Sequence, residues 1–169
     1  MSIEVKDRGN EEAARLTIEL IKKYDRYAIT VCGSDESWWT RRMLKMDPKL
    51  ATVAGKTDIL KLIFTYWLGL LPYVHFEREA FLLPYMTRDF IKMKENERAQ
   101  AKSWGERAFL TFYIYFGQLA NITMNPCLEH LQRRGIYTCY WVLNEPKELN
   151  YVIKKSKVEG IMTDRPEDL

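Results

Sequence analysis

An acidic and a basic side chain stand two residues apart in the segment I-E-V-K at residues 3–6. Apolar and charged residues alternate along this segment, a pattern that predicts a short β-strand. Successive side chains of a strand point to opposite faces, so Glu4 and Lys6 share one face. If that face lines the interior of a barrel, the two charges are buried side by side and have to pair or bind a metal. If it is an exposed edge of a sheet, they are ordinary solvated charges.

Other side chains of interest follow predicted strands near the end of the chain. Trp141 ends one predicted strand and Asn144 follows it, so the two either border a site or are a core tryptophan and a helix-capping asparagine. Asp164 follows the last predicted strand, where a cap or a turn former is a more common role than catalysis. His130 falls within a predicted helix, and His75 follows a long apolar segment. Neither histidine is expected to be catalytic.

The first third of the chain alternates predicted strands and helices. Asn10 caps a helix that extends to about residue 24, with its apolar residues on one face. Residues 28–33 form a continuous β-prone run ended by a glycine, as is typical of a strand buried on both faces. A second helix ends at the Asp-Pro pair 47–48, and residues 50–55 predict a weaker strand. This order predicts a parallel sheet.

The end of the chain repeats the same order. Asn125 caps a helix with Pro126 at its first position. Residues 136–142 predict a strand, residues 144–155 a helix, and residues 158–163 a last short strand. The sequence therefore predicts an α/β fold with about five to six parallel strands, whereas a barrel of this class closes with eight.

The middle of the chain has a different character. Residues 59–74 are almost wholly apolar, and their sixteen positions are fewer than the roughly 20 that a spanning helix needs. Either a buried helix or an interfacial membrane segment fits this composition, because its tyrosines and tryptophan favour a lipid headgroup boundary. Residues 88–107 predict a charged, solvated helix. Residues 109–116 are aromatic on all sides and suit a buried or lipid-contacting helix.

Composition excludes several classes of function. The net charge is only +3 and the basic residues occur in short pairs, so no nucleic-acid partner is expected. The 3 scattered cysteines and 2 histidines provide neither a disulfide framework nor a zinc site. The first residues are charged where a secretory signal would be apolar. We expect a cytoplasmic protein or one associated with intracellular membranes.

Two segments near the end of the chain match a known pattern in order and spacing. They are W-V-L-N-E at residues 141–145 and V-E-G-I-M-T-D-R-P at residues 158–166, which are similar to the last two strands of the glycerophosphodiester phosphodiesterase family. The opening I-E-V-K is similar to the E-x-K strand of this family. Y-D-R at residues 24–26 and L-G-L-L-P at residues 68–72 resemble its membrane-associated eukaryotic subgroup, which includes lysophospholipase D enzymes. The resemblance covers nearly the whole chain.

The resemblance implies a (β/α)8 TIM barrel that hydrolyses glycerophosphodiesters or lysophospholipids with a divalent cation, Mg²⁺ or Ca²⁺. Glu4 matches the metal-ligand glutamate of the family, and Lys6 matches its catalytic, phosphate-facing lysine. Trp141 matches a tryptophan that walls the substrate pocket. The residue types suit these roles, because hard cations take oxygen ligands and a lysine supplies positive charge to a phosphate.

The chain departs from the family pattern in one large respect. The H-R-G strand, the E-x-D metal motif and the second histidine of the family all precede the E-x-K strand, which begins here at Glu4. We therefore expect residues 1–169 to form an incomplete barrel without its first strands, with a hydrophobic and aromatic insertion at residues 57–119. One carboxylate cannot form a cage for a hard cation, so the chain alone is not expected to bind the metal tightly or to be active. Two explanations stay open: a truncated enzyme, or a short non-catalytic protein that binds a membrane or a partner.

Overall fold

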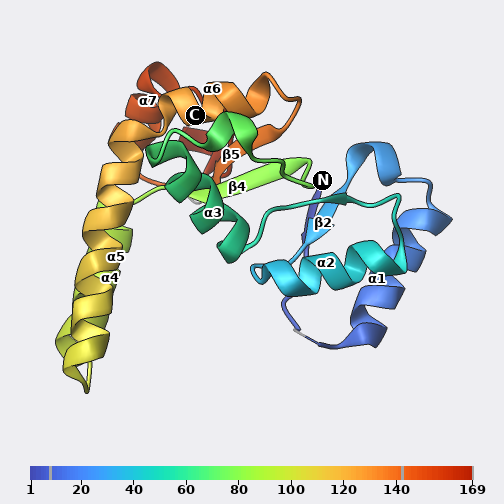
Figure 1. Cartoon of the computed structure of the whole chain (residues 1–169), viewed down its shortest axis with the longest axis horizontal. Helices are drawn as coiled ribbons and strands as arrows, with labels where there is room; N and C mark the ends of the chain where they lie inside the picture. Colours follow the sequence, from blue (N-terminus) through green and yellow to red (C-terminus); the bar gives the residue numbers. More distant parts are fainter. Residues whose placement is uncertain (8, 142, 169) are drawn as a thin grey trace. The chain divides into compact units, whose positions relative to one another are not determined.

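The computed structural model of the protein describes residues 1–7, 9–141 and 143–168, in which helices alternate with short strands (Figure 1). The chain folds into two compact units, and each is described by itself. Unit 1 comprises Met1–Leu82 and Leu131–Thr138, and unit 2 comprises Leu83–His130 and Cys139–Leu169.

Strands and helices alternate near the start and the end of the chain, as the sequence predicts, whereas three helices follow one another in between. Unit 1 contains β1 (Ser2–Glu4), α1 (Glu11–Lys23), η1 (Tyr27–Ile29), β2 (Val31–Gly33), α2 (Ser37–Met46), β3 (Ala51–Thr52), α3 (Lys56–Trp67) and η2 (Leu71–Tyr73). Unit 2 contains α4 (Arg88–Gln100), α5 (Trp104–Thr123), α7 (Pro146–Lys155), β6 (Gly160–Ile161) and η3 (Pro166–Asp168). Three elements have residues in both units: β4 (Ala80–Pro84), α6 (Asn125–Gln132) and β5 (Tyr137–Trp141).

The described strands form two three-stranded sheets, in the orders β1-β2-β3 and β4-β5-β6. β1 and β2 are parallel, with Ile3 opposite Cys32, and β2 and β3 are also parallel. A parallel bridge between Val53 and Ala80 links the end of β3 to the start of β4. Strands therefore neighbour one another in chain order, as they do in a β/α barrel. The α/β fold class is confirmed, and the incomplete barrel stays a prediction with which this order is compatible.

The core of unit 1 lies where α1 and α2 pack on the first sheet. The Asn10 side chain caps α1 by accepting a hydrogen bond from the backbone N–H of Ala13 at 3.0 Å. As predicted, the apolar residues of α1 share one face, which is buried with Val5, Cys32 and Trp39. The sequence pattern of α1 thus fixes both its start and its buried face.

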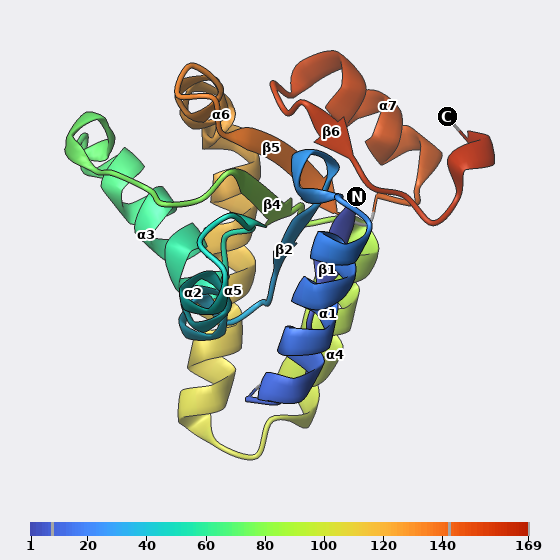
Figure 2. The same ribbon diagram turned by 90° about the vertical axis from the view of Figure 1, so that its right-hand side faces the viewer.

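Unit 2 contains a helical hairpin made of α4 and α5, which lie side by side in both ribbon views (Figures 1 and 2). Thr87 and Ser103 cap the two helices through their side-chain oxygens. The rings of Phe90 and Tyr113 join the helices, with 6.5 Å between their centroids. Within the described ranges, none of the helices combines the length and the apolar character needed to cross a bilayer.

The structure corrects three local predictions. The strand predicted at residues 28–33 begins only at Val31, because residues 27–29 form η1. Asn125 does not cap α6; its side chain instead donates to the carbonyl of Lys155 at 2.8 Å and accepts from the backbone N–H of Lys157 at 3.1 Å. A strand that the sequence pattern did not predict, β4, completes the six described strands.

The predicted insertion at residues 57–119 includes most of α3, all of β4 and α4, and most of α5. Its status as an insertion stays a prediction. The predicted last residue of the strand at 136–142, Val142, lies outside the described residues.

Candidate functional site

The acidic and basic side chains predicted to share a face, Glu4 and Lys6, lie at the end of β1 and just after it. Ile3 and Val5 face the core of unit 1, and Glu4 and Lys6 share the opposite, exposed face. The Lys6 Nζ and Glu4 Oε2 atoms are 3.7 Å apart, with 82% and 48% of the two side chains exposed. The alternation predicted from the sequence is therefore confirmed, and the pair corresponds to the exposed alternative. At this exposure the ion pair itself contributes little to stability.

A divalent cation requires more donors than this edge presents. Mg²⁺ needs octahedral coordination and Ca²⁺ takes six to eight oxygen ligands. Over residues 1–7, 9–141 and 143–168, no three His, Cys, Asp or Glu side chains are grouped closely enough to hold a metal ion. Glu4 therefore provides one carboxylate, and the described residues do not fit a resident Mg²⁺ or Ca²⁺.

Unit 2 contains a cleft of about 390 Å³ at the carboxyl ends of β4 and β5. Trp141 is the last residue of β5 and forms part of the wall of this cleft. Its role in binding a substrate stays a prediction. The cleft is lined by Pro84, Tyr85, Thr87, Asp89, Phe90, Met93, Trp141, Asn144, Glu145 and Glu148. Strands β4 and β5, the first turns of α4 and the start of α7 therefore build it together.

Aromatic rings form one side of this cleft. The Phe90 and Trp141 rings meet edge to face, with 6.4 Å between their centroids and planes at 85°. Tyr85 stacks edge to face on Tyr140 at 5.2 Å. Burial raises the pKa of Tyr140 to about 12, so its hydroxyl stays protonated at neutral pH. Burial, followed by the charges of neighbouring acidic groups, also raises the pKa of Tyr85.

Carboxylates form another part of the cleft. Glu148 accepts a hydrogen bond from the backbone N–H of Arg88 through Oε1, at 2.8 Å. Its Oε2 atom is buried, and no described residue donates a hydrogen bond to it. Asp89 lies in the first turn of α4 and Glu145 precedes the first residue of α7. Nothing in the local sequence marks these carboxylates as a site, because acidic residues are common at the start of a helix for reasons of helix stability alone.

The structure assigns Asn144 and Asp164 to a turn. Asn144 Oδ1 accepts from the backbone N–H of Asp164 at 2.9 Å, and its Nδ2 donates to the Asp164 carboxylate at 3.0 Å. Asn144 does not cap α7, whose N-cap position is Glu145. His75 is exposed in unit 1. His130 lies on α6 and is not among the residues that line the cleft of unit 2.

A buried ion pair in unit 1 was not predicted. Arg78 Nε donates to Asp58 Oδ2 at 3.1 Å, and only 3% and 11% of the two side chains are exposed. Arg78 also donates to the carbonyl of Glu77 at 2.8 Å, and Asp58 accepts from the backbone N–H of Gly55 at 3.3 Å. The partners are 20 residues apart, a separation at which sequence periodicity gives no signal. This network connects α3 to the segment before β4, and we regard it as structural.

No protein-family model matches the chain. The lysophospholipase D GDPD3 of Mus musculus is 27% identical over 169 residues, which cover 98% of this chain and 47% of the relative. The lysophospholipase D GDPD1 of Homo sapiens is 26% identical and that of Rattus norvegicus 28%, each over 100% of this chain and 50% of the relative. The chain therefore spans about half the length of the curated relatives it matches. The chain is thus similar along its whole length to proteins named lysophospholipase D, which supports the resemblance to the glycerophosphodiester phosphodiesterase family that the tail motifs indicate.

Proposed function

We propose that this chain is part of a metal-dependent phosphodiester hydrolase that acts on glycerophosphodiesters or lysophospholipids. The observation that carries the proposal is the cleft at the carboxyl ends of β4 and β5, because active sites of β/α folds lie at that end of their strands. Trp141 lines this cleft at the position that matches the substrate-pocket tryptophan of the family. The names of the relatives, lysophospholipase D, support the class of reaction.

In this reaction water adds to the phosphorus atom, and the P–O bond to one of the two esterified alcohols breaks. Lys6 would place its positive charge toward the phosphate as negative charge develops on the oxygens. Glu4 would donate one carboxylate oxygen to a divalent cation, which when bound polarises the phosphate. Trp141 would hold the organic part of the substrate. The described residues offer no complete metal site, so we expect no turnover by this chain alone.

The test measures choline released from lysophosphatidylcholine with Mg²⁺ or Ca²⁺. The purified chain is assayed alone and with the half of human GDPD1 that it does not match, expressed separately. The expected result is turnover only in the mixture, lost with Glu4→Ala and Lys6→Ala and kept with Glu12→Ala, an exposed carboxylate on α1. Turnover by the chain alone would contradict the expected inactivity, and a mixture without turnover would contradict the hydrolase proposal.

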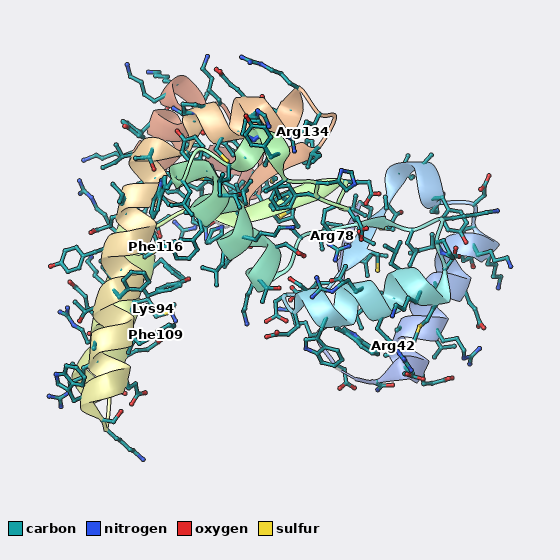
Figure 3. All side chains as sticks on the ribbon, viewed as in Figure 1. Arg42, Arg78, Lys94, Phe109, Phe116 and Arg134 are labelled. Atoms are coloured by element: carbon teal, nitrogen blue, oxygen red, sulfur yellow. The ribbon has the colours of Figure 1, made fainter. Side chains whose placement is uncertain are left out.

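A second candidate function is non-catalytic binding to an intracellular membrane surface. The specific observation is an exposed apolar stripe along α5, the helix on which Figure 3 labels Phe109. The stripe consists of Phe109, Phe112, Tyr115, Leu119 and Ile122, which recur every three or four residues on one face of the helix. The exposed apolar residues of α3, Leu60 and Phe64, are fewer, because this helix buries Leu62 and Ile63 in unit 1. The stripe on α5 is thus the better candidate for contact with lipid.

Co-sedimentation with phosphatidylcholine vesicles that contain phosphatidylserine tests this second function. We expect the wild-type chain to sediment and the double variant Phe112→Ser with Tyr115→Ser to stay in solution. The control is Phe64→Ser with Trp67→Ser on α3, which should sediment like the wild type. Binding lost equally in both double variants, or binding by neither the wild type nor the variants, would count against the α5 surface.

A further inference from the structure

The cleft of unit 2 has an unusual balance of charge for a protein expected to bind phosphodiesters. Three of its described lining residues are carboxylates, Asp89, Glu145 and Glu148, and none of those lining residues is lysine, arginine or histidine. Like charges that surround a small cavity reinforce one another, because the low-dielectric walls focus their field. The cleft therefore favours a positively charged group of a substrate over its phosphate group.

One of the three carboxylates is fixed in position with an oxygen unused. Glu148 Oε1 accepts from the backbone N–H of Arg88 at 2.8 Å, which ties α7 to the start of α4. Glu148 Oε2 is buried and receives no hydrogen bond from any described residue. A positive charge in the cleft would be attracted to this fixed carboxylate, and Asp89 and Glu145 would add to the attraction.

The aromatic wall suits the same kind of ligand. The electron-rich faces of tryptophan, tyrosine and phenylalanine attract cations within about 6 Å of the ring centroid. The neighbouring cluster already binds one ammonium group of the chain itself: Lys94 Nζ lies 5.5 Å from the centroid of Phe90 and 5.9 Å from that of Tyr113 (Figure 3). The Lys94 ammonium group is also paired with the Glu97 carboxylate, at 2.8 Å.

We propose that this cleft binds an organic ammonium group, and a quaternary ammonium in preference to a metal ion. A metal ion would need several converging oxygens, which no group of described side chains provides. A trimethylammonium group needs only a nearby carboxylate and apolar or aromatic walls, which Glu148, Met93 and Trp141 supply. A volume of about 390 Å³ is sufficient for such a ligand. This inference deepens the proposed function by assigning the cleft to the headgroup amine of a lysophospholipid rather than to its phosphate.

The experiment is a calorimetric titration of the whole chain with choline and, separately, with 3,3-dimethylbutan-1-ol, which has the same shape without the charge. We expect choline to bind at least about tenfold more tightly than the neutral alcohol, since a desolvated cation–aromatic contact is worth about 2 kcal/mol. Equal affinity for both, or no binding of choline by the folded chain, would overturn the proposal. Neither ligand is hydrolysed, so an absence of phosphodiesterase activity leaves this measurement unaffected.

Variants assign the binding to the named residues. Glu148→Gln keeps an acceptor for the Arg88 N–H, and we expect it to lower the affinity for choline about tenfold or more. Trp141→Leu should weaken choline binding similarly, and Trp141→Phe less so. Glu95→Gln removes the same charge from an exposed position of α4 and should bind like the wild type. If Glu148→Gln binds choline as tightly as Glu95→Gln does, the site is not this cleft.

A final comparison separates the two sources of the ammonium group. If the ligand is a lipid headgroup, monomeric lysophosphatidylcholine binds more tightly than choline, and lysophosphatidic acid, which has no amine, does not bind. If the ligand is a free amine, lysophosphatidylcholine gains nothing over choline. Binding of lysophosphatidic acid as tight as that of lysophosphatidylcholine would overturn the role of the ammonium group.

Discussion

Replacing Arg78 with leucine should lower the free energy of unfolding by about 3 kcal/mol, because it strands a buried carboxylate. Removing one partner of a buried ion pair typically costs about 3–5 kcal/mol. Here Asp58 keeps two weaker contacts, the Gly55 N–H at 3.3 Å and Arg41 at 3.7 Å. These contacts place the expected loss at the lower end of that range.

The assay is urea denaturation followed by circular dichroism, with Arg42→Leu as the matched control (Figure 3). Arg42 pairs with Glu11 on the surface, where 55% and 58% of the side chains are exposed, so its loss should cost less than about 1 kcal/mol. A cycle with Asp58→Asn and the double variant should give a coupling of about 1–3 kcal/mol between Arg78 and Asp58. A cost for Arg78→Leu no greater than that for Arg42→Leu would refute the buried-pair reasoning.

Three further predictions concern glycine packing, helix capping and buried thiols. Gly55→Ala should lower the free energy of unfolding by about 1–3 kcal/mol, because the added Cβ would collide with the backbone of Ser37. The control is Gly105→Ala on α5, where the added Cβ meets open space; in thermal melts this variant should be neutral or slightly stabilised. Asn10→Ala should cost about 1 kcal/mol by removing the cap of α1, and a melting temperature equal to that of the wild type would contradict the cap. A thiol reagent at pH 8 should leave the native protein unmodified and react fully once it is denatured, since burial raises the pKa values of its cysteines. In the folded protein the pKa values are about 11 for Cys32, 12 for Cys127 and 11 for Cys139, above the value of about 9 for an unperturbed thiol. The folded state therefore binds more thiol protons than the unfolded state between these values, so the contribution of the thiols to the free energy of unfolding falls as the pH rises above about 9.

Local sequence chemistry was enough to predict α1 and α7. In α1 the cap at Asn10 and the spacing of Ala14, Ile18 and Ile21 specify a start and a buried face within one short segment. In α7 a proline at the first helical position marks the start, and Lys154 and Lys155 occupy the last turn. Such signals act over one or two helical turns, so they can be read without knowledge of the fold.

Strand β4 was not predicted, because nothing in its local sequence specifies a strand. Its five residues, Ala80–Pro84, are a short apolar run ended by proline, which fits a strand, a loop or the end of a buried helix equally well. What makes it a strand is pairing: Val53 bridges to Ala80, and the N–H of Tyr137 donates to the carbonyl of Glu79 at 2.8 Å. These partners lie far away in the sequence, and no local pattern reveals them.

The same division applies to the candidate site. The sequence by itself determined that Glu4, at the end of β1, and Lys6, two residues later, lie on the same exposed side. It also determined that Trp141 ends a strand and which family the chain resembles, because each of these depends on short-range alternation or on ordered motifs. Only the tertiary structure brought Glu148 to the N–H of Arg88, 60 residues away, and so placed a carboxylate in the cleft beside Trp141. A cavity exists only where separate elements pack around it, and its charge is the sum of side chains that each look like an ordinary helix-end residue in the sequence.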